Sequence, residues 1–415
     1  MTTTEDQQPA PPSAVAGLSV RPLLFAVMAI CSGVTVANVY LAQPLLTLFA
    51  RGLGVAPSAT GVVVTCAQFG YAAGILFLVP LGDVRRRRPL LIVMLAATVI
   101  ALLLAAAAPG LSLLAAAAAL VGGFTVVPQV LVPLAAELAS PQRQASVVAW
   151  VQIGLMTGIV GSRVIGGAVG EAFGWRAVYV LAAVLTGASG LLTVALVPRE
   201  PARAATIGYG RLLASLPRLM RAEPALRHSC LLHASLFGAY NATWTSLVLV
   251  LTHEPYHFST ATAGLFGALG LAGAVAAPWA GRFIDRRGAL PIITAALALT
   301  LLSAAAYALG RTALAFMIVA IVSVNIAVQW SQIANQARIF VYLPEARSRA
   351  NTVYMVAVFL SGAICAAVAG VSYAAFGWPG VCALQAALAI AGLAVLPFAR
   401  RHDCRNRRNG TTVSP

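Results

Sequence analysis

An arginine stands inside a long apolar stretch of this 415-residue chain. Arg163 has glycines and aliphatic residues on both sides, and a charge in such a setting usually faces a polar cavity or meets a partner. Its guanidinium could bind an anion or a carboxylate, or exchange partners during a conformational change. The structural alternative is an arginine bonded to helix carbonyls or to an acid such as Glu137.

Polar and aromatic side chains follow helical spacing on other apolar stretches, which indicates faces turned away from lipid. One stripe lies between Asn325 and Gln336, and a second between His233 and Trp244. Amides and aromatic rings together suit an amphiphilic organic solute, whereas hydrogen bonding between helices is the alternative. The candidate cavity residues are Asn38, Gln129, Arg163, His233, Tyr240, Trp244, Gln329, Gln332 and Gln336.

Few titratable groups lie within the apolar stretches. His233 is the one histidine well inside such a stretch, and imidazole changes charge near neutral pH. Glu137 lies toward the end of its stretch. These two residues are the candidates for a proton relay. The alternative for His233 is a structural histidine that does not titrate.

Two acidic groups stand beside arginines where apolar stretches end. Asp83 precedes Arg87 and Arg88, and Asp285 precedes Arg286. Such charges can bridge two parts of a protein in one conformation and separate in another, so we expect a gate. The alternative for the arginines is anchoring of the topology by positive charge.

The sequence motifs give little support for enzyme chemistry or for metal binding. The string His253–His257 fits the zincin pattern H-E-x-x-H, but that chemistry needs an unbroken helix and Pro255 lies within the string. The six cysteines are scattered without a CxxC pair, and there is no G-x-x-x-x-G-K-[ST] loop for a nucleotide. We therefore expect no catalytic residue, no metal and no cofactor.

The composition is that of a membrane protein. Of all residues, 60% are hydrophobic and 9% are charged, whereas soluble domains carry about 25% charged residues. The net charge of +16 lies in the gaps between apolar stretches, so it does not indicate nucleic acid. A lipid bilayer is the expected partner.

Apolar stretches long enough to cross a bilayer recur along the chain, which predicts an all-α membrane protein with about twelve transmembrane helices. We expect a disordered N-terminus (1–21), a six-helix bundle (22–197), a linker (198–227), a second six-helix bundle (228–399) and a basic tail (400–415). The expected spans are 22–49, 60–81, 89–108, 111–138, 145–172, 176–197, 228–252, 260–282, 289–309, 312–341, 348–374 and 378–399.

The distribution of arginine predicts the topology. Nearly all arginines outside the spans fall on one side when the N-terminus is placed in the cytoplasm, as the positive-inside rule requires. We therefore expect a multi-pass protein of the inner or plasma membrane with both termini in the cytoplasm.

The two halves are repeats. Asp83 and Asp285 occupy equivalent helix ends, the sequence Ala172–Trp175 recurs at Ala375–Trp378, and Pro141 pairs with Pro344. The residue numbers within each pair differ by 202 or 203. Three landmarks at one offset indicate duplication into two pseudo-symmetric bundles, with a substrate site between them near the middle of the bilayer.

These residues resemble the major facilitator superfamily over essentially the whole chain. That family carries Gly-x-x-x-Asp-Arg-x-Gly-Arg-Arg after its second helix; Asp83, Arg87 and Arg88 match it in the first half. The second half keeps Gly281, Asp285, Arg286 and Gly288. The resemblance implies that helices 1, 4, 7 and 10 line a central cavity.

Asn38–Leu46, Val328–Ile339 and Asn351–Met355 look like the bacterial branch of drug:proton antiporters and sugar-efflux proteins. Antiporters of that branch carry Gly-Pro-x-x-Gly-Gly in helix 5, whereas this chain has Ser162 and Arg163 in place of the first pair. Helix 4 also lacks the embedded arginine of that branch.

The resulting hypothesis is a monomeric secondary transporter that exports small amphiphilic organic compounds by alternating access, with protons as the coupling ion. The first alternative is uptake of a polar or anionic solute anchored by Arg163. The second is a membrane sensor that transports nothing, although no signalling domain is attached.

Overall fold

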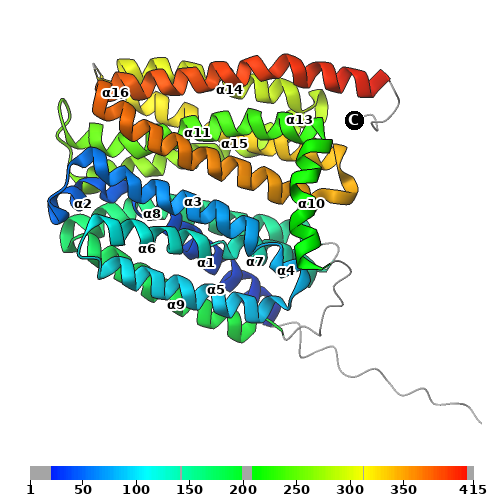
Figure 1. Cartoon of the computed structure of the whole chain (residues 1–415), viewed down its shortest axis with the longest axis horizontal. Helices are drawn as coiled ribbons and strands as arrows, with labels where there is room; N and C mark the ends of the chain where they lie inside the picture. Colours follow the sequence, from blue (N-terminus) through cyan, green and yellow to red (C-terminus); the bar gives the residue numbers. More distant parts are fainter. Residues whose placement is uncertain (1–19, 141–142, 199–207, 312, 409–415) are drawn as a thin grey trace, which may run out of the picture.

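The structure is a computed structural model that describes residues 20–140, 143–198, 208–311 and 313–408. The described residues form helices joined by short turns, and these helices gather into two bundles that lie against each other (Figure 1). The first bundle contains α1 (Val20–Tyr40), α2 (Leu46–Leu53), α3 (Gly61–Phe77), α4 (Leu81–Val84), α5 (Arg87–Ala106), α6 (Leu111–Phe124), α7 (Val127–Leu138), α8 (Gln144–Phe173) and α9 (Trp175–Leu196).

The second bundle repeats this arrangement. It contains α11 (Pro224–Thr252), α12 (Thr260–Leu265), α13 (Leu271–Arg287), α14 (Ala289–Leu309), α15 (Leu314–Tyr342) and α16 (Arg347–Arg408). Four single turns of 3₁₀ helix complete the described elements: η1 (Gln43–Leu45), η2 (Pro57–Thr60), η3 (Phe266–Gly270) and η4 (Pro344–Ala346).

Eleven helical segments of the described part are long and apolar enough to cross a membrane. The last of them, Pro344–Asn406, has 63 residues, which at about 1.5 Å per residue is several times the thickness of the hydrocarbon layer. It is two helices that meet at Gly377, where φ is 62° and ψ is −153°. The segments therefore make twelve crossings, and the prediction of an all-α membrane protein in two six-helix bundles is confirmed.

The repeated sequence motif has a repeated structure. Gly174 separates α8 from α9 with a φ of 81°, and Gly377 takes a positive φ at the equivalent place in α16. Trp175 packs edge-on against Phe49, with ring centroids 5.3 Å apart, and Trp378 packs edge-on against Tyr307 at 5.4 Å. A positive φ is strained for most side chains, which explains why both copies use glycine.

Some boundaries differ from those expected. The second bundle begins at Pro224, because α11 starts four residues before the predicted position. The last helix continues to Arg408, so part of the predicted tail is helical. The linker contains a helix, α10 (Tyr209–Ala222), and the Tyr209 hydroxyl donates to the Phe77 carbonyl at the end of α3 (2.7 Å). Residues 1–19, 199–207 and 409–415 lie outside the described residues.

Two ends of the bundle pair can be distinguished (Figure 1). The arginine-rich end carries Arg85–Arg88, Arg286 and Arg347, and α10 lies across it. The opposite end carries Arg51, Glu171 and Arg311. Between the ends, large apolar side chains face outward; Leu191, Val275 and Leu302 are 73%, 65% and 61% exposed. A surface of this kind needs a lipid environment.

Glycine permits close packing of the helices. A Cβ atom on Gly158 of α8 would lie 2.0 Å from the Gly33 carbonyl oxygen of α1, and one on Gly122 of α6 would lie 2.0 Å from the Ala67 carbonyl oxygen of α3. Any side chain would force these pairs apart, so the small residues set the helix spacing inside the first bundle.

Candidate functional site

A cavity of about 580 Å³ lies between the two bundles. It reaches the surface at the arginine-rich end, where its lining includes the exposed residues Arg347 and Ser348. The walls mix aromatic rings, methionines and amides from both bundles. Prominent lining residues are Tyr40, Tyr71, Gln129, Glu137, Met156, His233, Phe237, Gln332, Gln336, Asn351, Met355 and Phe359.

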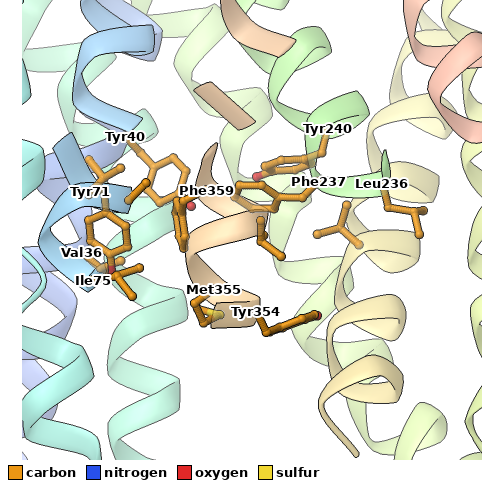
Figure 2. Close-up of a cluster of buried hydrophobic side chains, with 14 of the residues drawn as sticks. Val36, Tyr40, Tyr71, Ile75, Leu236, Phe237, Tyr240, Tyr354, Met355 and Phe359 are labelled. Carbon is orange, nitrogen blue, oxygen red and sulfur yellow. The ribbon is translucent and has the colours of Figure 1, made fainter. Parts of the chain in front are cut away.

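Aromatic side chains from both bundles meet at the inner end of the cavity (Figure 2). The ring of Phe359 on α16 lies 4.4 Å from that of Tyr71 on α3 and 5.1 Å from that of Phe237 on α11. Tyr40 and Tyr240 extend the cluster toward the opposite end. These contacts join the bundles and form an apolar floor for the cavity.

Beyond this floor the bundles are bonded directly. The buried Gln68 side chain donates to Asn241 Oδ1 across the interface (3.0 Å), and Glu171 Oε2 accepts from the backbone N–H of Ala261 (2.6 Å). Glycines of α12 and η3 lie against α8: a Cβ atom on Gly264 would be 2.6 Å from the Arg163 carbonyl oxygen. The passage is therefore closed at the opposite end.

Arg163 is part of this closed region, and its side chain is only 2% exposed. Its Nε donates to Gln43 Oε1 (3.1 Å) in the same bundle, and its Nη2 donates to the Tyr240 hydroxyl (2.7 Å) in the other. The guanidinium carbon lies 3.9 Å from the centre of the Trp244 ring. Tyr40 adds a second aromatic face at 5.4 Å. Aromatic faces attract a cation, so this cage partly compensates for the lost hydration.

No carboxylate pairs with Arg163 among the described residues, and its Nη1 has no hydrogen-bond partner there. A smaller cavity of about 80 Å³ adjoins the guanidinium and is lined by Asn325, Gln329, Gln332 and Gly270. The alternative ion pair with Glu137 does not form, because Glu137 pairs with Arg87.

The predicted amides are divided between the two cavities. Gln129 donates to the Tyr71 hydroxyl (3.5 Å), and Gln336 donates to Asn351 Oδ1 (3.1 Å); both line the large cavity. Gln329 lines the small cavity, and Gln332 lines both. The stripe between Asn325 and Gln336 on α15 thus runs along the passage.

His233 lines the large cavity but is almost fully buried. Its Nδ1 lies 2.9 Å from Ser331 Oγ, and its ring stacks on Tyr354 with centroids 5.6 Å apart. The hydrogen bond fixes the orientation of the ring, and the surrounding apolar side chains separate it from water.

The expected gate residues lie at the arginine-rich end. Arg87 is buried and makes two hydrogen bonds of 2.8 Å to the Glu137 carboxylate, which is half-exposed at the cavity wall. Arg88 Nε donates to the Val194 carbonyl (3.1 Å). Asp285 and Arg286 are exposed at the end of α13. The side chain of Asp83 lies outside the described part of the structure.

Two predicted cavity residues have other surroundings. Asn38 lines neither cavity; its amide donates to Thr125 Oγ1 (3.3 Å) and Thr186 Oγ1 (3.1 Å), so it joins helices within the first bundle. Trp244 contributes its ring face to Arg163 and also lines neither cavity.

Sequence reasoning missed four residues of this region: Tyr40, Gln43, Tyr71 and Phe359. The sequence did contain a signal for Gln43, namely the proline that follows it. A proline tends to end a helix, and α1 ends at Tyr40, just before the turn η1 that contains Gln43 and Pro44. This break turns Gln43 toward Arg163. Tyr71 lies on α3 and Phe359 lies on the first part of α16, which are the second and eleventh membrane crossings. The family resemblance pointed only to the first, fourth, seventh and tenth crossings.

The zincin-like string does not form the helix that such chemistry requires. α11 ends at Thr252, and His253–His257 forms a turn with a cis peptide bond before Pro255. The described residues contain no group of three or more histidine, cysteine or acidic side chains that could hold a metal ion.

Comparison with known proteins agrees with this architecture. The chain is 47% identical over 371 residues to "Probable transporter SCO4007" of Streptomyces coelicolor, which covers 89% of this chain and 86% of that protein. It is 37% identical over 374 residues to "Uncharacterized transporter YgaY" of Escherichia coli O157:H7, covering 90% and 95% respectively.

Solved structures share the fold at low identity. A bacterial homolog of the human lysosomal transporter Spinster, in an inward-facing and unoccupied conformation, has a TM-score of 0.66 at 14% identity over 96% of this chain and 99% of that one. The peptide transporter POT in complex with sulfate has a TM-score of 0.72 at 13% identity, covering 91% and 95%.

The sequence profile described as Major Facilitator Superfamily matches residues 28–345. The match spans most of the twelve crossings and includes the motifs beside Asp83 and Asp285. The chain therefore belongs to the Major Facilitator Superfamily and is a membrane transporter of that type.

Proposed function

We propose that this transporter exports small amphiphilic organic compounds from the cytoplasm by alternating access, in exchange for protons. The observation that carries the proposal is the central cavity of about 580 Å³, which is open at the arginine-rich end and closed at the other. Its mixture of rings, methionines and amides suits a solute with an apolar body and a few polar groups.

The side of the membrane that the open end faces is inferred from the distribution of charge. Membrane proteins keep arginine-rich loops in the cytoplasm, so the open end of the cavity would face the cytoplasm of the cell and load from it. Both termini would then be cytoplasmic, in the inner or plasma membrane.

Glu137 is our candidate for the proton-binding group. Of the described residues that line the large cavity, it is the one carboxylic acid, and it is held by Arg87. A proton on Glu137 removes its negative charge and weakens both hydrogen bonds to Arg87, which changes the contacts at the arginine-rich end. His233 is the second candidate, and its almost fully buried ring lies 2.9 Å from Ser331 Oγ.

The test uses three naphthalene probes of matched size with different charges: a 2-sulfonate, a 2-sulfonamide and a 2-trimethylammonium. Inverted membrane vesicles that contain the transporter should accumulate at least one probe when the interior is acidified, and a protonophore should abolish the accumulation. Accumulation of none, or accumulation equal to that of vesicles without the transporter, would contradict the proposal.

Glu137→Gln tests the coupling. This variant should lose accumulation driven by the pH gradient but retain exchange of labelled for unlabelled probe, because exchange needs no net proton movement. The matched control is Glu345→Gln, which removes an exposed carboxylate at the same end. If Glu137→Gln accumulates the probe as the parent protein does, Glu137 is not the proton-binding group. The same measurement on His233→Gln then tests the second candidate.

Uptake is the second candidate, since the same passage could run in reverse. In this alternative a solute with an acidic group would be held by Arg163, which has no carboxylate partner among the described residues. Uptake requires loss of probe from the acidified vesicles, so the sign of the flux decides between the two directions.

A further inference from the structure

We propose that the transported solutes are organic monoanions and that their acidic group binds to Nη1 of Arg163 in the small cavity. This inference rests on the proposed function, whose substrate class it specifies. It depends on four observations: the lack of a countercharge, the donors around the small cavity, the residues that line both cavities and the excess of positive charge.

The first observation concerns the charge of Arg163. The guanidinium is 2% exposed, and its two bonded partners, Gln43 and Tyr240, are neutral. A buried cation without a countercharge is strongly unfavourable, and the aromatic cage around it offsets only part of this cost. An arginine of this kind is expected where an anion is supplied during the working cycle.

The second observation is that hydrogen-bond donors stand ready beside it. Nη1 of Arg163 has no partner within the described part, although it is buried. The half-buried side chains of Gln329 and Gln332 line the same small cavity, where their amide groups can donate hydrogen bonds to a solute. Buried polar groups are normally bonded, so an unpartnered guanidinium nitrogen that faces a cavity beside two amide side chains indicates a ligand.

Space beside the guanidinium is kept open by glycine. A Cβ atom on Gly270 would lie 3.8 Å from Arg163 Nη1 and 3.3 Å from Asn325 Oδ1. A larger side chain there would fill the approach to Nη1. The small cavity of about 80 Å³ accommodates a sulfonate- or carboxylate-sized group but not a whole organic solute.

The third observation is a shared wall between the two cavities. Tyr40, Phe237 and Gln332 line both, together with Met156 and Ile159. A solute whose acidic group meets Arg163 would therefore place its apolar body against these rings and aliphatic side chains, at the inner end of the large cavity. This arrangement matches an amphiphile with one charged end.

The fourth observation is the balance of charge along the passage. The charged side chains that line the two cavities, within the described residues, are Arg87, Arg163, Arg347 and Glu137. Three cations face one anion, so the passage attracts anionic solutes and repels cations. Because a single guanidinium lies at the inner end, the solute should carry one negative charge.

Binding of the three naphthalene probes to purified transporter in nanodiscs tests the inference. The 2-sulfonate should bind at least about tenfold more tightly than the 2-sulfonamide, since a hydrogen bond between charged groups adds about one to two powers of ten. The 2-trimethylammonium compound should bind more weakly than either. This comparison needs only the unmodified protein.

Arg163→Gln should bind the sulfonate only as tightly as it binds the sulfonamide. Its affinity for the sulfonamide should differ from that of the unmodified protein by less than about threefold. Arg163→Lys retains a charge without the planar fork, so it should keep part of the preference. Arg282→Gln is the matched control: it removes an exposed arginine of α13 that lines neither cavity and should preserve the preference.

The outcomes separate the two proposals. Equal binding of the three probes, or a sulfonate preference that survives in Arg163→Gln, would overturn the anion site. Transport of the neutral or cationic probe with equal efficiency would also overturn it, while leaving export of amphiphiles intact. Absence of transport for every probe would overturn the proposed function itself.

Discussion

At the opposite end of the passage, hydrogen bonds run from one bundle to the other, whereas two ion pairs at the arginine-rich end each join helices of a single bundle. Arg163 reaches Tyr240, and Gln68 reaches Asn241, across the interface. Arg87 pairs with Glu137 inside the first bundle, and Arg338 pairs with Asp403 inside the second.

This difference explains why the cavity opens where it does. Bonds across the interface hold the bundles together at one end, while ion pairs within a bundle stiffen it and leave the other end free to separate. The alternating-access proposal requires the cross-interface contacts to be weak enough to break in each cycle. The Gln68–Asn241 bond is of the neutral kind that averages only about 0.6 kcal/mol between membrane helices.

The largest expected effect comes from an ion pair within a bundle. Arg338 is 3% exposed; it donates to Asp403 (2.7 Å), to the Ala225 carbonyl and to Ser229 Oγ (both 2.8 Å). Arg338→Gln should lower the free energy of unfolding by about 3 kcal/mol, because Asp403 loses its cation partner. Unfolding in mixed micelles measures this loss.

Arg338→Gln should leave the open end of the cavity unchanged, because the ion pair between Arg338 and Asp403 does not cross the interface between the bundles. Arg286→Gln is the control, since its side chain is exposed, and its effect on stability should lie within about 0.5 kcal/mol. If Arg338→Gln were to open the opposite end instead, the distinction between the two kinds of contact would be wrong.

A wedge at the opposite end should have an intermediate effect. Gly264→Leu places a Cβ atom 2.6 Å from the Arg163 carbonyl oxygen, so α12 cannot stay against α8. The closed arrangement should lose about 1–3 kcal/mol, the usual cost of overpacking, and transport should fall at least tenfold. Transport of the naphthalene probes by proteoliposomes provides the measurement.

Gly161→Leu is the matched control for this wedge. It lies on the same helix as Arg163, but the nearest atom to its Cβ position is Ile165 Cδ1 at 3.8 Å. Transport by this variant should stay within about twofold of the parent protein, since ordinary van der Waals contact costs little. Equal losses in both variants would show that general helix distortion, and not the interface, limits transport.

The smallest effect should come from one amide pair. Gln68→Leu removes the hydrogen bond to Asn241 and should cost the closed arrangement about 0.6 kcal/mol, which is roughly a threefold change in the balance of conformations. Labelling of Arg51→Cys at the opposite end, in a background without native cysteines, can report this shift. A complete loss of closure would mean that this pair dominates the interface.

Much of the fold could be predicted because the signals for it are local. Apolar length defines the spans, and the repeated Gly-Trp pairs at Gly174 and Gly377 mark equivalent helix starts in both bundles. The stripe between Asn325 and Gln336 on α15 also lies along the passage, since amides at helical spacing on one face rarely meet lipid. The buried position of Arg163 follows from the same reasoning.

The direction in which each helix face points could not be predicted in the same way. Asn38 shares its helix face with Thr35, but α1 packs against neighbours on several sides. The side-chain amide of Asn38 therefore meets Thr125 and Thr186 within the first bundle. The aromatic floor at Tyr71 and Phe359 depends on contact between helices far apart in sequence. The rotation of each helix is set by packing with its partners, which no single stripe encodes.

The central claim is that the passage opens at one end only when it closes at the other. Spin labels at Arg51→Cys and Arg311→Cys span the opposite end, and labels at Arg86→Cys and Arg286→Cys span the arginine-rich end; all four positions are exposed. Pulsed electron resonance should show that Gly264→Leu lengthens the first distance and shortens the second. If the first distance lengthened while the second stayed the same or also lengthened, the two ends would be independent and the account would be contradicted.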